Sequence, residues 1–335
     1  MLSVCLTAES QITWPEGQLL PSFPAPAETQ DLIYLRESAE GNTAAEMYLF
    51  SSMKGLINRT KPRIFSYEGD NLAEGAHTWF NALGFRWNEW GVKNTWDVLT
   101  KYKDEIDGLV VYDPNQIHTV NLAIPIAHRK NALIASPDLL PRLQAEPYNF
   151  EILQDLRGQF SSVIDIYNYA YENFWKNEAT LDKRILINLS PENHKSGLRE
   201  YAVALGTPVL WLEANWFYGG DPIIIAGTNF GGNGEKAVLV KFLSEMPKGG
   251  NCLGWWTSEQ DGVELGSIYG LTTIASDYCV NLTFHSGTSR TVIPRPMPAK
   301  PKLENKIYVA FILSDGDNLQ YIEHVMLMLW NRDAR

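Results

Sequence analysis

Apolar runs of strand length alternate with helix-length stretches along most of the chain. The run Gly108–Tyr112 is apolar without a break, and an apolar-periodic stretch from Val120 to His128 follows it. Uninterrupted apolar strands are typical of parallel sheets whose two faces are covered by helices. The pattern therefore predicts an α/β fold with parallel sheets. Further strands are expected at Asp31–Leu35, Arg63–Tyr67, Arg184–Asn188, Pro208–Leu212 and Cys252–Trp256, and further helices at Ala44–Ile57, Ser161–Asn173 and Gly197–Leu205.

Proline-rich stretches divide the chain into expected units. Four prolines in residues 1–30 predict an extended arm, and the prolines from Pro294 to Pro301 predict an extended linker, because proline interrupts both helices and central strands. A chain of 335 residues is also too long for one small core. We expect α/β domains at 31–107, 108–230 and 231–293, a linker at 294–303 and a last unit at 304–335.

The last unit opens with the strongest buried-strand signal in the chain, Lys306–Leu313, and continues with a helical pattern from Leu319 to Trp330. A single strand and one helix cannot bury their own apolar surfaces. We therefore expect this unit either to dock on the preceding domains or to begin a larger domain that the chain cuts short.

Composition narrows the classes of partner. Lys and Arg number 28 against 39 Asp and Glu, which gives a net charge of −11 and opposes binding to nucleic acid or to an anionic membrane. No apolar run is long enough to span a bilayer, and Met1–Ser10 does not form a complete secretory signal. The spacing of Cys5, Cys252 and Cys279 argues against a disulfide framework or a zinc ribbon, but leaves one bridge between Cys252 and Cys279 open.

The segment Ser314–Asn318 (Ser-Asp-Gly-Asp-Asn) directly follows the predicted strand Lys306–Leu313. Ligands and catalytic side chains collect at the carboxyl ends of parallel strands. Asp315 and Asp317 are therefore candidate catalytic residues or ligands of a divalent cation, and Asn318 is a candidate substrate-binding residue. The alternative is structural, with Asp317 capping the next helix and Asp315 closing the turn. No other cofactor is expected.

A second group of candidate residues lies at the end of the predicted strand Cys252–Trp256. Aromatic residues are abundant in the chain, with 11 Trp, 15 Tyr and 13 Phe, and an indole either fills a core or offers a flat face to a sugar. We expect Trp255, Trp256 and Asp261 to bind substrate and Glu259 to be catalytic or to contact the ligand. Adjacent strand residues point to opposite faces, so at most one indole can line the same cleft as Glu259.

Several of these runs together resemble the GxGYxYP family, whose members are proposed to be glycoside hydrolases. The resemblance begins near Asp31, spans nearly the whole chain and is most specific in its last run. The runs are Gly55–Arg59 with Pro62–Ile64, Gly108–Pro114, Gly254–Trp256 with Glu259, and Ser314–Tyr321.

The resemblance implies several small Rossmann-like α/β domains followed by a β/α-barrel-like domain, in proteins that bacteria mostly export to a secreted or periplasmic location. The motif that names the family is absent from this sequence. We therefore expect the chain to end after the first β/α unit of a truncated barrel-like domain.

The leading functional hypothesis is a carbohydrate-active hydrolase that resembles glycoside hydrolases and acts on a carbohydrate substrate. One alternative is a non-catalytic carbohydrate-binding or scaffold protein, in which the aromatic residues bind and the acids cap helices. Another is a metal-dependent deacetylase or phosphoester hydrolase that uses Asp315 and Asp317 as its cation site. The sequence carries no signal for a particular glycan, linkage or oligomeric state.

Overall fold

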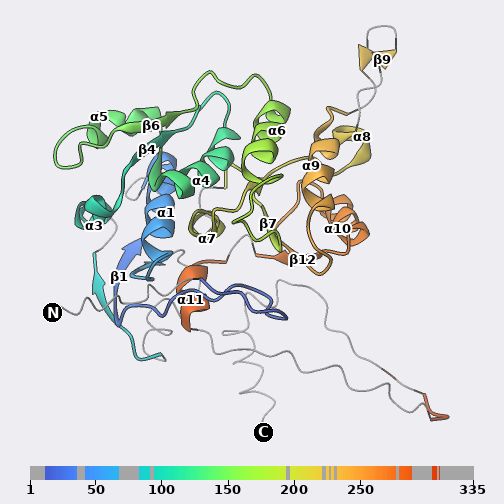
Figure 1. Cartoon of the computed structure of the whole chain (residues 1–335), viewed down its shortest axis with the longest axis horizontal. Helices are drawn as coiled ribbons and strands as arrows, with labels where there is room; N and C mark the ends of the chain where they lie inside the picture. Colours follow the sequence, from blue (N-terminus) through green and yellow to red (C-terminus); the bar gives the residue numbers. More distant parts are fainter. Residues whose placement is uncertain are drawn as a thin grey trace, which may run out of the picture.

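The structure is a computed structural model of the whole chain (Figure 1). It describes residues 12–35, 42–67, 83–90, 94–193, 197–220, 224–225, 228–229, 232–276, 279–288, 304–307 and 309. The described strands form three parallel sheets and one short antiparallel pair, β9 with β10.

The first sheet has the strand order β2-β1-β3, and both of its pairings are parallel. Helix α1 begins with a capping box, in which the Thr43 side chain accepts a hydrogen bond from the Glu46 amide and the Glu46 carboxylate accepts one from the Thr43 amide. The elements of this part are β1 (Thr29–Tyr34), α1 (Ala44–Asn58), β2 (Ile64–Tyr67), β3 (Arg86–Glu89), α3 (Thr95–Tyr102) and the 3-10 turn η2 (Lys103–Glu105).

The second sheet has the order β5-β4-β6, again with parallel pairs. Its central strand β4 is buried along its whole length, as the unbroken apolar run predicts. The elements are β4 (Gly108–Val111), α4 (Thr119–Lys130), β5 (Ala132–Ala135), η3 (Pro137–Leu139), α5 (Leu140–Leu143), β6 (Ile152–Asp155) and α6 (Val163–Phe174).

The third sheet has the order β12-β11-β7-β8, and its strands run parallel, with Gly254 paired to Asn188. Helices α9 and α10 lie on the side of β7 away from α1 and α4 (Figure 1). The elements are β7 (Ile185–Asn188), α7 (Leu198–Leu205), β8 (Val209–Leu210), α8 (Trp216–Gly219), β9 (Ile224–Ile225), β10 (Thr228–Asn229), α9 (Glu235–Ser244), β11 (Asn251–Gly254), α10 (Glu259–Ile268), β12 (Thr272–Ala275) and α11 (Leu282–Thr288).

One hydrophobic core joins the three sheets. It contains Ile33 of β1, Val110 of β4 and Ile187 of β7 in a single cluster of contacting residues. Helix α1 is buried from Met47 through Asn58 and packs on both β5 and α7. A helix buried on all sides belongs to the interior of a larger unit, so α1 holds the three sheets together.

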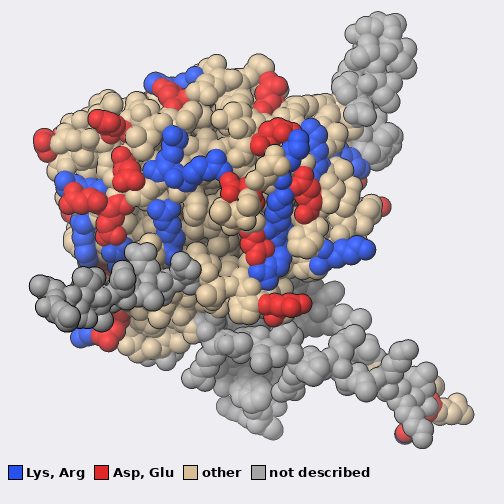
Figure 2. All heavy atoms as spheres, viewed as in Figure 1, with Lys and Arg blue, Asp and Glu red and all other residues tan. Residues whose placement is uncertain are grey.

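The surface carries charges of both signs. Figure 2 shows lysine and arginine side chains beside aspartate and glutamate side chains over the face in view. Neighbouring opposite charges such as Lys183 and Glu245, whose Nζ and Oε2 atoms are 2.6 Å apart, form ion pairs. Surface pairs of this kind add little stability.

The prediction of an α/β fold with parallel sheets is confirmed. The third sheet takes strands from both sides of the predicted boundary at 230/231, and the domain limits stay a prediction. The predicted β/α unit at 304–335 lies almost wholly outside the described residues. Cys252 and Cys279 are not joined by a disulfide.

Candidate functional site

The third sheet contains a topological switch point, which is where ligands most often bind in open α/β sheets. From β7 the chain passes through α7 to β8 on one side, whereas β11 and β12 extend the sheet on the other side. The strand order therefore reverses between β7 and β11. In open parallel sheets, ligands bind outside the carboxyl ends of the strands at such a switch point. Here those ends are Asn188 and Gly254, and the Trp255 amide donates a hydrogen bond to the Asn188 carbonyl oxygen at 3.0 Å.

Gly254 determines how the chain leaves β11. Its φ of 100° lies in the region that side-chain-bearing residues rarely adopt, and a Cβ atom there would overlap the Asn188 carbonyl oxygen. The predicted strand Cys252–Trp256 therefore ends at Gly254, because the backbone is no longer extended. Trp255 and Trp256 belong to the following turn.

The structure separates the two adjacent indoles. Trp256 is 3% exposed, and its Nε1 atom donates to Thr273 Oγ1 at 3.1 Å, so it is a core residue between α10 and β12. Trp255 is half-buried at the carboxyl edge of the sheet. Strand alternation does not apply to these two residues, because both lie in the turn after β11, and the expectation that at most one indole lines the same cleft as Glu259 stays a prediction. The burial of Trp256 gives no support to its predicted role in binding substrate, whereas Trp255 remains a candidate.

Glu259 and Asp261 lie in the first turn of α10, where carboxylates interact favourably with the helix dipole. The Asp261 carboxylate accepts hydrogen bonds from Ser258 Oγ and from Asn215 Nδ2, the latter at 3.0 Å. These bonds, that of Ser258 first, hold the pKa of Asp261 below its ordinary value. Asp261 is thus an ionised hydrogen-bond acceptor at neutral pH, and Glu259 is exposed beside it.

The loop after β8 supplies polar groups that the sequence reasoning did not single out. Thr257 Oγ1 donates to the Leu212 carbonyl oxygen at 3.1 Å, which joins the β11 loop to the β8 loop across the end of β7. The backbone N–H of Asn215 donates to Glu213 Oε1 at 2.9 Å, and the backbone N–H of Glu213 donates to Glu235 Oε2 at 2.7 Å. A signal was present, since Glu213 and Asn215 directly follow the predicted strand Pro208–Leu212 at its carboxyl end.

The arrangement is suited to recognising hydroxyl groups. We name Glu213, Asn215, Thr257, Ser258 and Asp261 the switch-point cluster. It contains two carboxylates, of Glu213 and Asp261, that hydrogen bonds hold in place on the loops after β8 and β11, and the half-buried Trp255 precedes Thr257 on the β11 loop. Among the described residues, no three His, Cys, Asp or Glu side chains are grouped so that they could hold a metal ion.

The candidates of the carboxyl-terminal run, Asp315, Asp317 and Asn318, lie outside the described residues. Their catalytic, cation-binding and substrate-binding roles stay predictions.

Fold and switch point together define an α/β protein with parallel sheets and a topological switch point of the kind at which ligands bind. Residues 106–178 match the model of the GxGYxYP_N second domain, and residues 183–287 match that of the GxGYxYP third domain. The two matches together cover more than half of the chain and include the switch-point cluster. The chain belongs to the GxGYxYP family.

A solved structure shares this fold. It is the crystal structure of a protein from Bacteroides thetaiotaomicron VPI-5482 described as a "putative hydrolase", with 20% sequence identity and a TM-score of 0.66. The match covers 93% of this chain and 56% of that protein, so the chain spans little more than half of its relative's length. No curated protein matches the sequence. None of the described helices is both long and apolar enough to cross a membrane.

Proposed function

We propose that the chain is part of a carbohydrate-active hydrolase of the GxGYxYP family that cleaves glycosidic bonds. In this proposal Asp315 and Asp317 supply the acid and base groups, and the switch-point cluster with Trp255 and Glu259 holds a sugar. Family membership and the fold shared with a protein described as a hydrolase support the general class.

One observation carries the carbohydrate part of the proposal. The Asp261 carboxylate is oriented by Ser258 and Asn215 at the switch point, and the half-buried Trp255 indole lies on the adjacent turn. A sugar needs acceptors for its hydroxyl groups and a flat apolar surface for its C–H face. The same edge offers both.

The lowered pKa of Asp261 limits its role. A general acid must carry a proton near the working pH, which requires a raised carboxyl pKa. Asp261 is ionised there, so it accepts hydrogen bonds from the substrate rather than protonating the leaving group. The acid that protonates the leaving group must be another residue, which is the role proposed for Asp315 or Asp317.

Release of reducing sugar from a panel of glycans tests the proposal. A version extended to the full length of the family should cleave at least one glycan, and Asp315→Ala and Asp317→Ala in that version should each abolish turnover. Asp104→Ala is the matched control, because the Asp104 side chain is 89% exposed. If the Asp315 variant hydrolyses the same glycan at an unchanged rate, the catalytic role is removed.

A non-catalytic carbohydrate-binding protein is the second candidate. It is favoured by the place of Asp261 in the first turn of α10, where the helix dipole and the hydrogen bonds from Ser258 and Asn215 give the carboxylate a structural role. Glycan binding that survives in the Asp315→Ala/Asp317→Ala double variant, together with no hydrolysis by a version of full family length, would select this candidate.

A further inference from the structure

A cavity lies at the edge of the third sheet opposite the switch point, by the amino ends of the strands. Its walls come from the carboxyl ends of α4, α6 and α7 and from the segment that leads into β7. The volume is about 330 Å³, within the lower part of the range of small-molecule sites, roughly 300 to 1,000 Å³. The cavity is therefore separate from the switch-point cluster and large enough for a small ring compound.

His128 presents an acceptor on one wall of this cavity. Its Nδ1 atom is 2.8 Å from the Val203 carbonyl oxygen, and because a carbonyl oxygen only accepts, Nδ1 carries the proton. Burial lowers the pKa of His128, and the nearby Arg59 and Arg129 charges act in the same direction. The ring is thus neutral at neutral pH. Its Nε2 atom is an acceptor with no hydrogen-bond partner in the described part of the chain.

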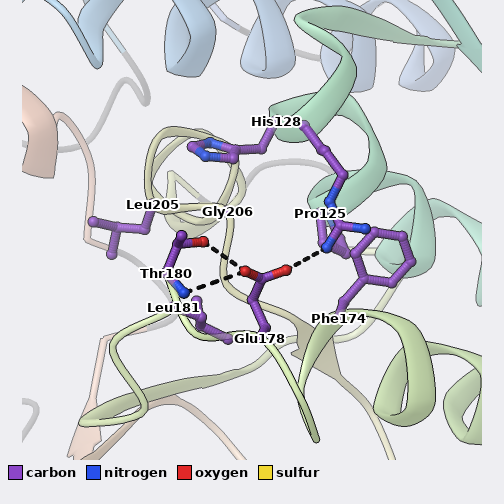
Figure 3. A pocket seen from close by; sticks show the side chains of 9 residues that line it. Pro125, His128, Phe174, Glu178, Thr180, Leu181, Leu205 and Gly206 are labelled. Atoms are coloured by element: carbon purple, nitrogen blue, oxygen red, sulfur yellow. Dashed lines mark hydrogen bonds and ion pairs between the residues drawn. The ribbon is translucent and has the colours of Figure 1, made fainter.

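Gly206 determines the position of that ring. It ends α7 with a φ of 70°, and a Cβ atom at this position would lie 2.5 Å from Cδ2 of His128. Only glycine therefore allows the imidazole to lie directly against the backbone. Figure 3 shows the His128 ring extending from α4 to the backbone beside Gly206.

Glu178 and Thr180 lie together in another part of the lining (Figure 3), and Arg129 also lines the cavity. Its carboxylate accepts from Thr180 Oγ1 at 2.6 Å, from the Thr180 amide at 3.2 Å and from Arg129 Nη2 at 2.6 Å. The carboxylate and the guanidinium neutralise each other, so this part of the lining has no net charge. The Arg129 Cζ atom lies 4.4 Å from the centre of the Phe174 ring. Nη2 of Arg129 donates to Glu178 and to the Asn173 carbonyl oxygen, and the guanidinium has further N–H groups that can donate to a ligand.

The remaining walls are apolar and come from Pro125, Phe174, Leu181 and Leu205. A ligand for this cavity must therefore have an apolar face, hydroxyl groups that donate to Nε2 and to the carboxylate, and oxygens that accept from the guanidinium. An anionic ligand would be repelled by the Glu178 carboxylate, because the charge of Arg129 is already paired with that carboxylate. We propose that this cavity binds a neutral hydroxylated ring, of the size of a monosaccharide or a cyclitol, as a site distinct from the one that hydrolyses glycans.

Saturation-transfer NMR on the whole chain tests the inference, with glucose, galactose, xylose and myo-inositol as neutral probes and glucuronate as the anionic probe. At least one neutral probe should receive saturation, and more strongly than glucuronate. Leu181→Trp fills the cavity and should weaken binding at least tenfold. Ile268→Trp adds the same indole at a residue that is 68% exposed on α10 and should leave binding unchanged.

Arg129→Met is a second variant, because it removes the guanidinium donors. It should also weaken binding at least tenfold in a protein whose melting temperature shows that it is folded.

Asp261→Asn separates this cavity from the switch-point cluster, since it should leave binding at the cavity intact. If Asp261→Asn reduces binding and Leu181→Trp leaves it unchanged, the inference is overturned and the proposed function is supported instead. A preference for glucuronate, or no transfer to any neutral probe at millimolar concentration, would also overturn it. Binding lost in Leu181→Trp, together with no glycan hydrolysis by a version of full family length, would uphold the inference and count against the proposed function.

Discussion

The Lys54 Nζ atom lies 3.5 Å from Glu200 Oε2, and both side chains are buried, at 0% and 1% exposure. Lys54 is on α1 beside the first sheet, and Glu200 is on α7 of the third. The ammonium also donates to Ser66 Oγ and to Asn281 Oδ1, both at 2.6 Å. One buried polar network therefore connects parts of the chain that are far apart in sequence.

Removing one member of this pair should be costly. Glu200→Gln leaves the buried ammonium without its carboxylate, and Lys54→Met leaves the carboxylate without its cation. We expect each to lower the free energy of unfolding by about 3–5 kcal/mol, measured by urea denaturation. Glu28→Gln removes an ion pair with Arg86 in which both side chains are mostly exposed, and should cost below about 1 kcal/mol. Equal losses in Glu200→Gln and Glu28→Gln would show that the buried pair is not essential.

Asp31 should make the protein sensitive to acid. Burial alone would raise the pKa of this carboxyl, but hydrogen bonds from Lys101, Tyr102, Trp90 and Asn88 outweigh burial and lower it below 3.8. A carboxyl whose pKa is lower in the folded state contributes stability above its unfolded pKa and loses it as pH falls through the folded one. Melting temperature should therefore drop below about pH 4, and this drop should be smaller in Asp31→Asn.

The same acid titration can contradict the role given to Asp31. If wild-type chain and Asp31→Asn lose stability in parallel between neutral pH and pH values below the ordinary carboxyl pKa of 3.8, the hydrogen bonds to Asp31 do not govern acid sensitivity.

Gly254→Ala should distort the switch point. A positive φ costs a residue with a side chain roughly 1–3 kcal/mol, and here the new Cβ atom also overlaps the Asn188 carbonyl oxygen. Gly249→Ala is a matched control, since its φ is 83° but nothing lies within 4 Å of the added Cβ. Urea denaturation should show a clearly larger loss for Gly254→Ala. Similar losses in the two variants would mean that contact with Asn188 is unimportant.

Much of the fold could be predicted because buried parallel strands are apolar without interruption. The run Gly108–Tyr112 corresponds to β4 at Gly108–Val111, and Ala44–Ile57 corresponds to α1 at Ala44–Asn58. Helix α10 was not predicted, because Glu259–Ile268 contains two glycines and has no clear apolar stripe.

The candidate site could be predicted only in part. The carboxyl end of β11 was identifiable, and with it Trp255, Glu259 and Asp261. The meeting of Asp261 with Asn215 depends on β8 and β11 flanking β7, and this strand order is not encoded in local spacing. The pairing of Lys54 with Glu200 likewise depends on how α1 packs on α7.

The central claim is that a sugar is held at the switch point of the third sheet. Its most direct test is NMR of the indole N–H groups during titration with a glycan that the protein binds or cleaves, with Trp255→Phe and Trp256→Phe used to assign the two signals. The account predicts that the Trp255 signal shifts while that of Trp256, bonded to Thr273 in the core, stays in place. Saturable glycan binding that leaves the Trp255 signal unmoved would contradict it.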